Sequence, residues 1–210
     1  KQGHFTIFEF TGGITYQPSN ALSVSFSPQY ARYPHRTQYV TETQFNGMPR
    51  YITSEIDNKT LSAAIRVNYT INPNLTIQYY GQPFIARGRY SHFNYITNPI
   101  AESLFDRYQL IEEGQITKQS DTGMYMVDEN LDGTMDYSFD DPDFSLVEFR
   151  SNLVVRWEYI PGSELFLVWS QGISNFMDPS DSLARGLESG IFGQKPENIF
   201  LMKLTYRLAL

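Results

Sequence analysis

The stretch Asn20-Ala21-Leu22-Ser23-Val24-Ser25-Phe26-Ser27-Pro28-Gln29-Tyr30 decides the fold class. From Leu22 to Tyr30 every second residue is apolar or aromatic, and serine or glutamine fills the positions between. Successive side chains of a β-strand point to opposite faces, so this alternation predicts a strand with one apolar and one polar face. The chain is therefore expected to be built from two-faced strands.

The same period of two recurs along the chain and predicts seven strands in all. The strand that contains the stretch quoted above is expected to extend over 21–45. The other six are expected within residues 4–16, 50–71, 75–90, 148–160, 164–174 and 198–210. Residues 164–174 differ because Leu165 to Trp169 is apolar at every position. Their pattern leaves open which face of that strand turns to which side.

The connections between these strands are of two kinds. Three are tight, namely Pro18-Ser19-Asn20, Asn72-Pro73-Asn74 and Pro161-Gly162-Ser163, whose residues favour sharp turns. Long connections run over about 91–147 and 175–198, and Asn46-Gly47 joins the two longest strands. This order places every tight turn at one end of the sheet and every long connection at the other.

Such sidedness is typical of an outer-membrane β-barrel, which has short periplasmic turns and longer extracellular loops. We expect an all-β fold, an antiparallel transmembrane β-barrel, with residues 1–210 as one barrel segment and long outer loops at about 91–147 and 175–198. Seven strands do not close an ordinary barrel, because bacterial single-chain barrels have an even number. The segment is therefore expected to be the C-terminal portion of a larger barrel.

Composition excludes several other classes of protein. The 210 residues carry a net charge of −7, which disfavours nucleic acid as a partner. No cysteine is present, so disulfide scaffolds and thiolate zinc sites are excluded. The longest apolar run, Leu165 to Trp169, is far shorter than the ~20 residues of a membrane helix. Aromatic residues form 15% of the chain, far too many for a disordered acidic segment.

Charged residues fall on the polar faces of the predicted strands. In a barrel these faces surround the lumen, where opposite charges would pair. The predicted lumen network consists of Glu9, Arg66, Arg156, Glu158, Lys203 and Arg207. Tyr16, Tyr69, Trp157 and Tyr159 lie near the tight turns, where an interfacial aromatic girdle is expected.

Three stretches carry a resemblance to a known family: residues 72–84, residues 198–206, and Arg150-Ser151-Asn152-Leu153-Val154-Val155-Arg156-Trp157-Glu158-Tyr159-Ile160-Pro161-Gly162-Ser163. Together they resemble a bacterial, Bacteroidetes-like outer-membrane family of unknown function. In that family a C-terminal barrel region often follows a carbohydrate-binding-like N-terminal domain. The resemblance implies a location in the bacterial outer membrane, with its lipid bilayer as partner, and it implies no reaction.

The most specific local motif is Asp128-Glu129-Asn130-Leu131-Asp132-Gly133-Thr134-Met135-Asp136. Oxygen ligands at loop positions 1, 3, 5 and 9, with glycine at position 6, are typical of a calcium loop. The predicted ligands are Asp128, Asn130, Asp132, Thr134 and Asp136, and the expected cofactor is a structural Ca²⁺. Position 12 is Phe139 instead of glutamate, so an ordinary acidic turn is the alternative.

No catalytic residue is predicted. His4, His35 and His92 lack metal-ligand spacing, and no nucleophile elbow or phosphate loop is present. The acidic pairs at 112–113 and 140–141 are interpreted as solvated charge. Short helices are expected within 99–110 and 180–191. Four loop aromatics are candidates for stacking on a sugar: Tyr90, Phe93, Tyr95 and Phe105.

These patterns predict a non-enzymatic outer-membrane segment that binds or passes a solute, a glycan being the expected class, at the cell surface. Two alternatives stay open at this point. One is a soluble all-β carbohydrate-binding module with structural calcium, and the other is a surface hydrolase.

Overall fold

The computed structural model of the chain describes residues 6–208. Its elements, in chain order, are β1 (Phe8–Thr11), β2 (Ile14–Ser19), β3 (Leu22–Phe45), β4 (Met48–Asn72), β5 (Leu75–Ile96), η1 (Leu104–Asp106), β6 (Tyr108–Leu110), β7 (Ile116–Lys118), β8 (Tyr125–Val127), β9 (Tyr137–Phe139), β10 (Phe144–Ile160), β11 (Ser163–Phe176), α1 (Leu183–Phe192) and β12 (Glu197–Thr205). The all-β prediction is confirmed. No helix among the described residues is long and apolar enough to cross a membrane.

The main sheet has seven strand positions, as the alternation predicts. Its order is β1-β3-β4-β5-β10-β11-β12, with β2 also paired to β3 and β6 to β5. In the described residues this sheet is open, with β1 and β2 at one edge and β12 at the other. The glycines at 12 and 13 separate β1 from β2, where the sequence predicts one strand with a bend.

The chain divides into two compact units, which are described separately. The sheet unit consists of residues 8–31, 59–87 and 144–208. The loop unit consists of residues 6–7, 32–58 and 88–143. Strands β3, β4 and β5 contribute residues to both units.

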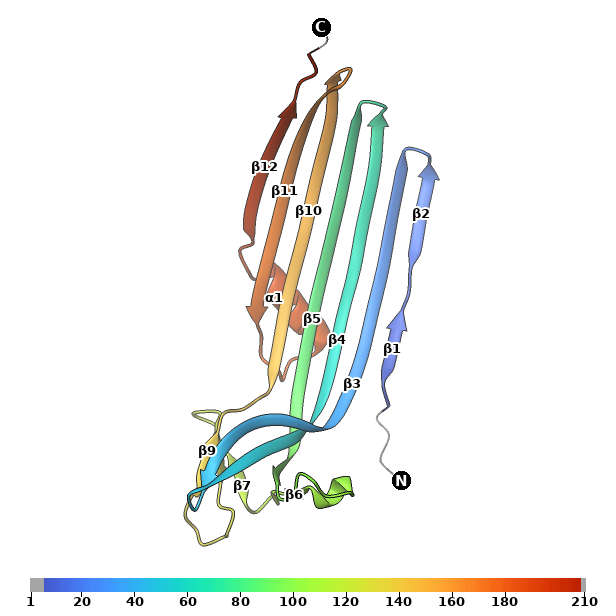
Figure 1. Cartoon of the computed structure of the whole chain (residues 1–210). Coiled ribbons are helices and arrows are strands. Elements are labelled where there is room, and N and C mark those ends of the chain that lie inside the picture. Colours follow the sequence, from blue (N-terminus) through green and yellow to red (C-terminus); the bar gives the residue numbers. More distant parts are fainter. Residues whose placement is uncertain (1–5, 209–210) are drawn as a thin grey trace. The chain divides into compact units, whose positions relative to one another are not determined.

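In the sheet unit the three predicted tight turns join β2 to β3, β4 to β5 and β10 to β11. Figure 1 shows all three at the same end of this unit, which confirms their predicted sidedness. Asn74 carries the second turn, where its backbone nitrogen donates to Asn72 Oδ1 at 2.9 Å. Gly162 carries the third with φ +80°, a left-handed conformation that glycine adopts without steric cost.

The last strand is shorter than the predicted 198–210. Strand β12 ends at Thr205, whose partner Glu164 is the last residue that β11 offers to the ladder. Beyond that pair, the backbone nitrogen of Arg207 donates to Ser163 Oγ at 3.0 Å. His4 and Leu210, which the sequence places in or beside terminal strands, lie outside the described residues.

Helix α1 confirms the helix predicted within 180–191. Ser182 is its N-cap, and its side chain accepts from the backbone nitrogen of Arg185 at 3.2 Å. Two glycines one turn apart allow the helix to approach the sheet, because a Cβ at Gly190 would lie 2.8 Å from Val147 Cγ1. The helix thereby covers part of β10, where Val147 is fully buried.

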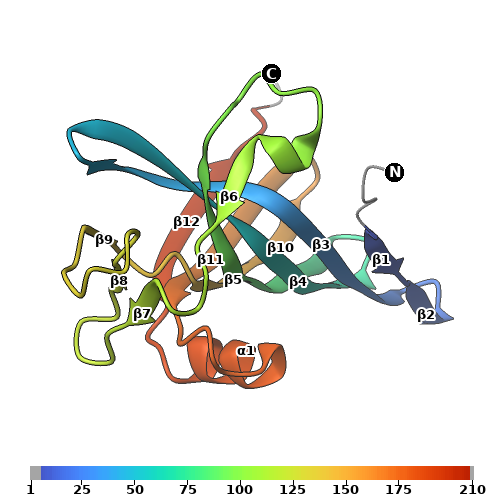
Figure 2. The same cartoon turned by 90° about the horizontal axis from the view of Figure 1, so that it is seen from below.

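The loop unit is organised around a buried aromatic and aliphatic cluster. A small antiparallel sheet, β7-β8-β9, lies in this unit (Figure 2). The buried members of the cluster are Ile52, Phe93, Tyr95, Ile111, Val127, Tyr137 and Phe139. The helix predicted within 99–110 is wrong except for the single turn η1, because residues 108–110 pair with residues 94–96 of β5 instead.

Candidate functional site

Register settles which side chains share a face of β10, β11 and β12. Leu153 pairs with Trp169, and Trp169 pairs with Phe200, so the three lie on one face. The next rows on that face repeat the pattern. We call the resulting surface the apolar belt, and its members are Leu153, Val155, Trp157, Leu165, Leu167, Trp169, Phe200, Met202 and Leu204.

The apolar belt is largely uncovered. Phe200 is 73% exposed, Met202 71% and Leu204 63%. The same face is covered further along β10, where α1 packs on Val147. An exposed apolar surface of this extent marks contact with a partner, a ligand groove or a membrane.

Aromatic side chains with polar atoms border the belt at both ends. Toward the long connections, the indole nitrogen of Trp169 donates to Asn198 Oδ1 at 2.8 Å. Toward the tight turns, Trp157 packs edge-on against Tyr159 at 6.1 Å, and the Tyr159 hydroxyl donates to the Thr205 carbonyl. Trp169 and Tyr159 thus have their polar atoms hydrogen-bonded while their rings border the belt, as aromatic side chains do at a membrane interface.

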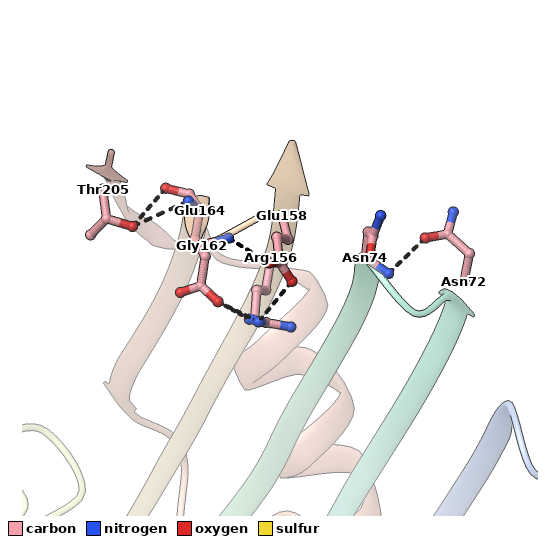
Figure 3. A network of polar contacts seen from close by, with 7 residues as sticks. All are labelled: Asn72, Asn74, Arg156, Glu158, Gly162, Glu164 and Thr205. Carbon is pink, nitrogen blue, oxygen red and sulfur yellow. Dashed lines mark hydrogen bonds and ion pairs between the residues drawn. The ribbon is translucent and has the colours of Figure 1, made fainter. Parts of the chain in front are cut away.

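The opposite face of the same strands, here called the polar face, is mixed. One of its rows, Val154, Val168 and Leu201, is apolar, and charged side chains gather beside the tight turns. There Arg156 donates through Nε to Glu164 Oε1 at 2.9 Å and lies 3.8 Å from Glu158 Oε2. Glu158 also accepts from the backbone nitrogen of Gly162 at 2.8 Å, so it anchors the turn between β10 and β11. Figure 3 shows these groups converging beside the tight turns, with Thr205 Oγ1 bonded to the backbone of Glu164.

Of the six residues predicted for the lumen network, Arg156 and Glu158 lie in direct contact with each other. The ammonium of Lys203 lies over the Phe166 ring at 5.9 Å, in the row beside Arg156. The Arg207 side chain lies against Gly162, while Arg66 covers the Tyr80 ring at 5.0 Å. Glu9 lies on β1, at the other edge of the sheet.

Sequence reasoning missed Glu164 and Thr205 as members of this network. Ser163 pairs with Ile160 across the two-residue turn, and a shift in register then pairs Glu164 with Glu158 instead of Tyr159. Counting the register outward from the turn would have placed Glu164 opposite Tyr159, so this shift brings Glu164 beside Arg156. Thr205 had no local signal, because its place depends on the pairing of β12.

A second polar group on this face surrounds Arg150. Its guanidinium crosses Gly172, where a Cβ would lie 2.6 Å from Arg150 Nη1. Glu148 Oε1 lies 3.6 Å from the same guanidinium. Lys195 and Glu197 line an open hollow of about 240 Å³ next to it. Both signs of charge are present, so this hollow has no clear preference for an anion or a cation.

The predicted calcium loop forms a compact turn in the loop unit. Asp128 is buried, and its carboxylate accepts from the backbone nitrogens of Asp132 at 3.2 Å and Gly133 at 2.8 Å. Asp136 Oδ2 accepts from Glu129 N, and Asp132 Oδ1 from both the backbone nitrogen and the hydroxyl of Thr134. These bonds hold the pKa of the Asp132 carboxyl below its ordinary value.

The five predicted ligands therefore lie on one turn, with their oxygens directed mostly at backbone donors. Asn130 belongs to the same network through its Oδ1, which accepts from the backbone nitrogen of Asp132 at 3.0 Å. Among residues 6–208, no group of three or more His, Asp or Glu side chains is arranged to hold a metal ion. Calcium binding at this turn stays a prediction.

Behind the loop lies a partly buried ion pair. Arg50 donates to Glu129 through Nε at 3.1 Å and through Nη2 at 2.8 Å, and the Tyr137 hydroxyl donates to the same carboxylate at 2.9 Å. The guanidinium is also held between the Phe45 and Tyr95 rings, at 5.1 and 4.8 Å. The bond to Glu129 raises the pKa of Arg50, while burial and the same carboxylate raise the pKa of Tyr137.

The loop aromatics proposed for sugar stacking separate into two groups. Phe93 and Tyr95 are 5% and 7% exposed and belong to the buried cluster, and Tyr90 packs against it, so these three rings pack within their own loop unit. Phe105 is 59% exposed. An open hollow of about 590 Å³ lies beside Phe93, with Ile111, Glu112 and Glu113 in its wall.

Comparison with known proteins gives one match. The family model described as "Domain of unknown function (DUF5916)" matches residues 2–209. No curated protein and no solved structure matches the chain.

Proposed function

We propose that the chain, which belongs to the DUF5916 family, is a segment of an outer-membrane β-barrel. The proposal is based on the two different faces of its sheet. In this proposal the apolar belt faces lipid and the Arg156 face lines the lumen. The segment then takes part in the binding or passage of a solute, such as a glycan, at the cell surface. Its long connections, including the loop unit, lie outside the membrane.

The exposed apolar belt is the observation that carries the proposal. On β10 the belt runs from Leu153 to Trp157, and Tyr159 borders it. The six steps of roughly 3.3 Å from Leu153 to Tyr159 give about 20 Å of strand, or about 15 Å across a bilayer at a tilt of about 40°. The belt therefore spans a little over half of the ~25 Å apolar band of outer-membrane barrels, and its aromatic borders resemble their girdles.

The polar face supports a filled or gated lumen over a wide pore. Arg156 is engaged by two carboxylates, and Lys203 lies against a ring of the neighbouring strand. Long side chains held across the face in this way occupy the space through which a solute would pass. Solute passage would then require these contacts to open, or would follow another part of the lumen.

One observation keeps a second function in view. The loop unit has its own buried cluster and an ordered acidic turn, as expected of a soluble carbohydrate-binding module stabilised by calcium. That alternative predicts a protein that stays folded without detergent. Fractionation of the native full-length protein separates the two. The barrel predicts an outer-membrane protein that migrates faster unboiled than boiled, and a soluble protein would contradict it.

Two neighbouring substitutions sharpen the test. Leu167 lies on the apolar belt, whereas Val168 pairs with Val154 and Leu201 on the polar face. Leu167→Arg should destabilise the inserted barrel by about 2–4 kcal/mol if the residue lies at the bilayer midplane. It should therefore reduce the heat-modifiable form, the species that migrates faster unboiled than boiled, while Val168→Arg is tolerated. Equal loss from both variants, or greater loss from Val168→Arg, would contradict the assignment of faces.

A further inference from the structure

The two edges of the sheet unit run in the same direction. Strand β2 pairs antiparallel with β3, β10 with β11, and β11 with β12. Two-residue turns connect β3 to β4 and β4 to β5, which makes these pairs antiparallel hairpins as well. Figure 1 shows β5 and β10 in opposite directions, so the first and seventh strand positions point the same way.

This direction limits how the sheet closes. Antiparallel pairing of β12 with β1 or β2 is impossible, because those edges are parallel to it. A ring of two copies meets the same obstacle, since β12 of one copy would lie beside the parallel β2 of the other. Pairing β12 with β12 of an inverted copy would send the tight turns of the two copies to opposite sides of the membrane.

The edge of β12 lacks the features that keep a strand edge free. Eight of its nine residues are exposed, and the strand contains no proline. Glu197 and Lys203 are its charged residues, and the Lys203 ammonium lies over Phe166 of the neighbouring strand. Natural edge strands are usually short, charged outward, bulged or covered, because their unpaired backbone groups recruit other strands.

We propose that the free edge of β12 is covered by a further antiparallel strand of the same polypeptide, and that an odd number of such strands completes the barrel. This inference rests on the proposed membrane sheet. The added strand has apolar residues on the face of Phe200 and Met202 and polar residues on the face of Lys203. Seven positions plus an odd number give the even total of single-chain bacterial barrels.

Proline substitutions in the full-length protein test the covered edge. Leu201 and Met202 are adjacent, so one backbone N–H points toward β11 and the other away from it. On a covered strand both N–H groups are bonded, and both Leu201→Pro and Met202→Pro should lower the heat-modifiable form at least about tenfold. On a free edge the outward position tolerates proline. Loss in only one variant would therefore overturn the proposal.

The alanine variants at both positions are the matched controls and should retain the heat-modifiable form. If fractionation finds a soluble protein, the effect of the two proline variants is measured as the yield of protease-resistant protein. This measurement tests the covered edge separately from membrane insertion.

The chain that supplies the added strand is identified by analysing the unboiled species, which should contain one polypeptide. A second chain in it, or a full-length structure with an even number of added strands, would overturn the proposal.

Discussion

The sheet unit carries a continuous apolar belt on its surface, whereas the loop unit packs seven apolar and aromatic side chains into a buried cluster. Phe200 and Met202 on β12 are more than 70% exposed, while Ile52 and Val127 of the loop unit are fully buried. Both units are rich in apolar and aromatic residues, so composition does not separate them. The difference indicates that the loop unit is stabilised by its own core, and that the belt depends on an environment that covers it.

The largest expected effect comes from breaking the partly buried ion pair of the loop unit. Glu129→Leu leaves Arg50 without its partner between two rings, and should destabilise this unit by about 3 kcal/mol, the lower end of the cost for a buried pair, because a fifth of the Arg50 side chain is exposed. Proteolysis of the loop unit in urea measures the loss. If the two units are stabilised separately, the heat-modifiable form of the protein should persist.

The control for this variant is the double change Arg50→Met with Glu129→Leu. It replaces both charges by apolar groups and should recover most of the stability. Equal damage from the single and double variants would mean that the charge pairing contributes little.

Calcium should stabilise the loop unit and leave the apolar belt unaffected. At a hundred times its Kd the ion would add about 2.7 kcal/mol to the folded unit. Thermal unfolding with calcium and with chelator measures the shift. Asp132→Ala should abolish it, whereas Asp121→Asn, outside the motif, should not. An unchanged melting temperature would indicate that residues 128–136 form an ordinary acidic turn that does not bind calcium.

A substitution on α1 tests the contact between this helix and β10. Gly190→Ala places a methyl group 2.8 Å from Val147 Cγ1 and should cost about 1–3 kcal/mol through overpacking. Gly114→Ala is the control, because no atom lies within 4 Å of the added Cβ. Equal stability of the two variants, measured by denaturant unfolding, would show that α1 moves away freely.

The smallest expected effect is a pH dependence confined to the loop unit. Burial raises the pKa of Asp143, whose carboxylate accepts from the backbone nitrogen of Tyr90 at 2.6 Å. The folded carboxyl thus binds its proton more readily than the unfolded one. Its contribution to stability is fully present below the unfolded pKa and is lost as pH rises through the folded pKa.

The variant Asp143→Asn keeps the acceptor oxygen and removes the titration. The free energy of unfolding, measured from pH 3 to 7, should therefore fall less with rising pH in the variant than in the parent. Parallel curves would mean that this carboxyl titrates alike in both states.

The sequence alone determined the period-two strands, the three tight turns and the polar side of β10, because alternation and turn chemistry are local properties. The stretch from Leu165 to Trp169 is apolar throughout, so its facing depended on the register that places Leu167 with Val155 and Met202. Only the tertiary structure brought Arg50 to Glu129, 79 residues away, and buried Phe93 and Tyr95. Long-range pairing leaves no local trace in the sequence, because the energy of a contact depends on which distant segments fold against each other.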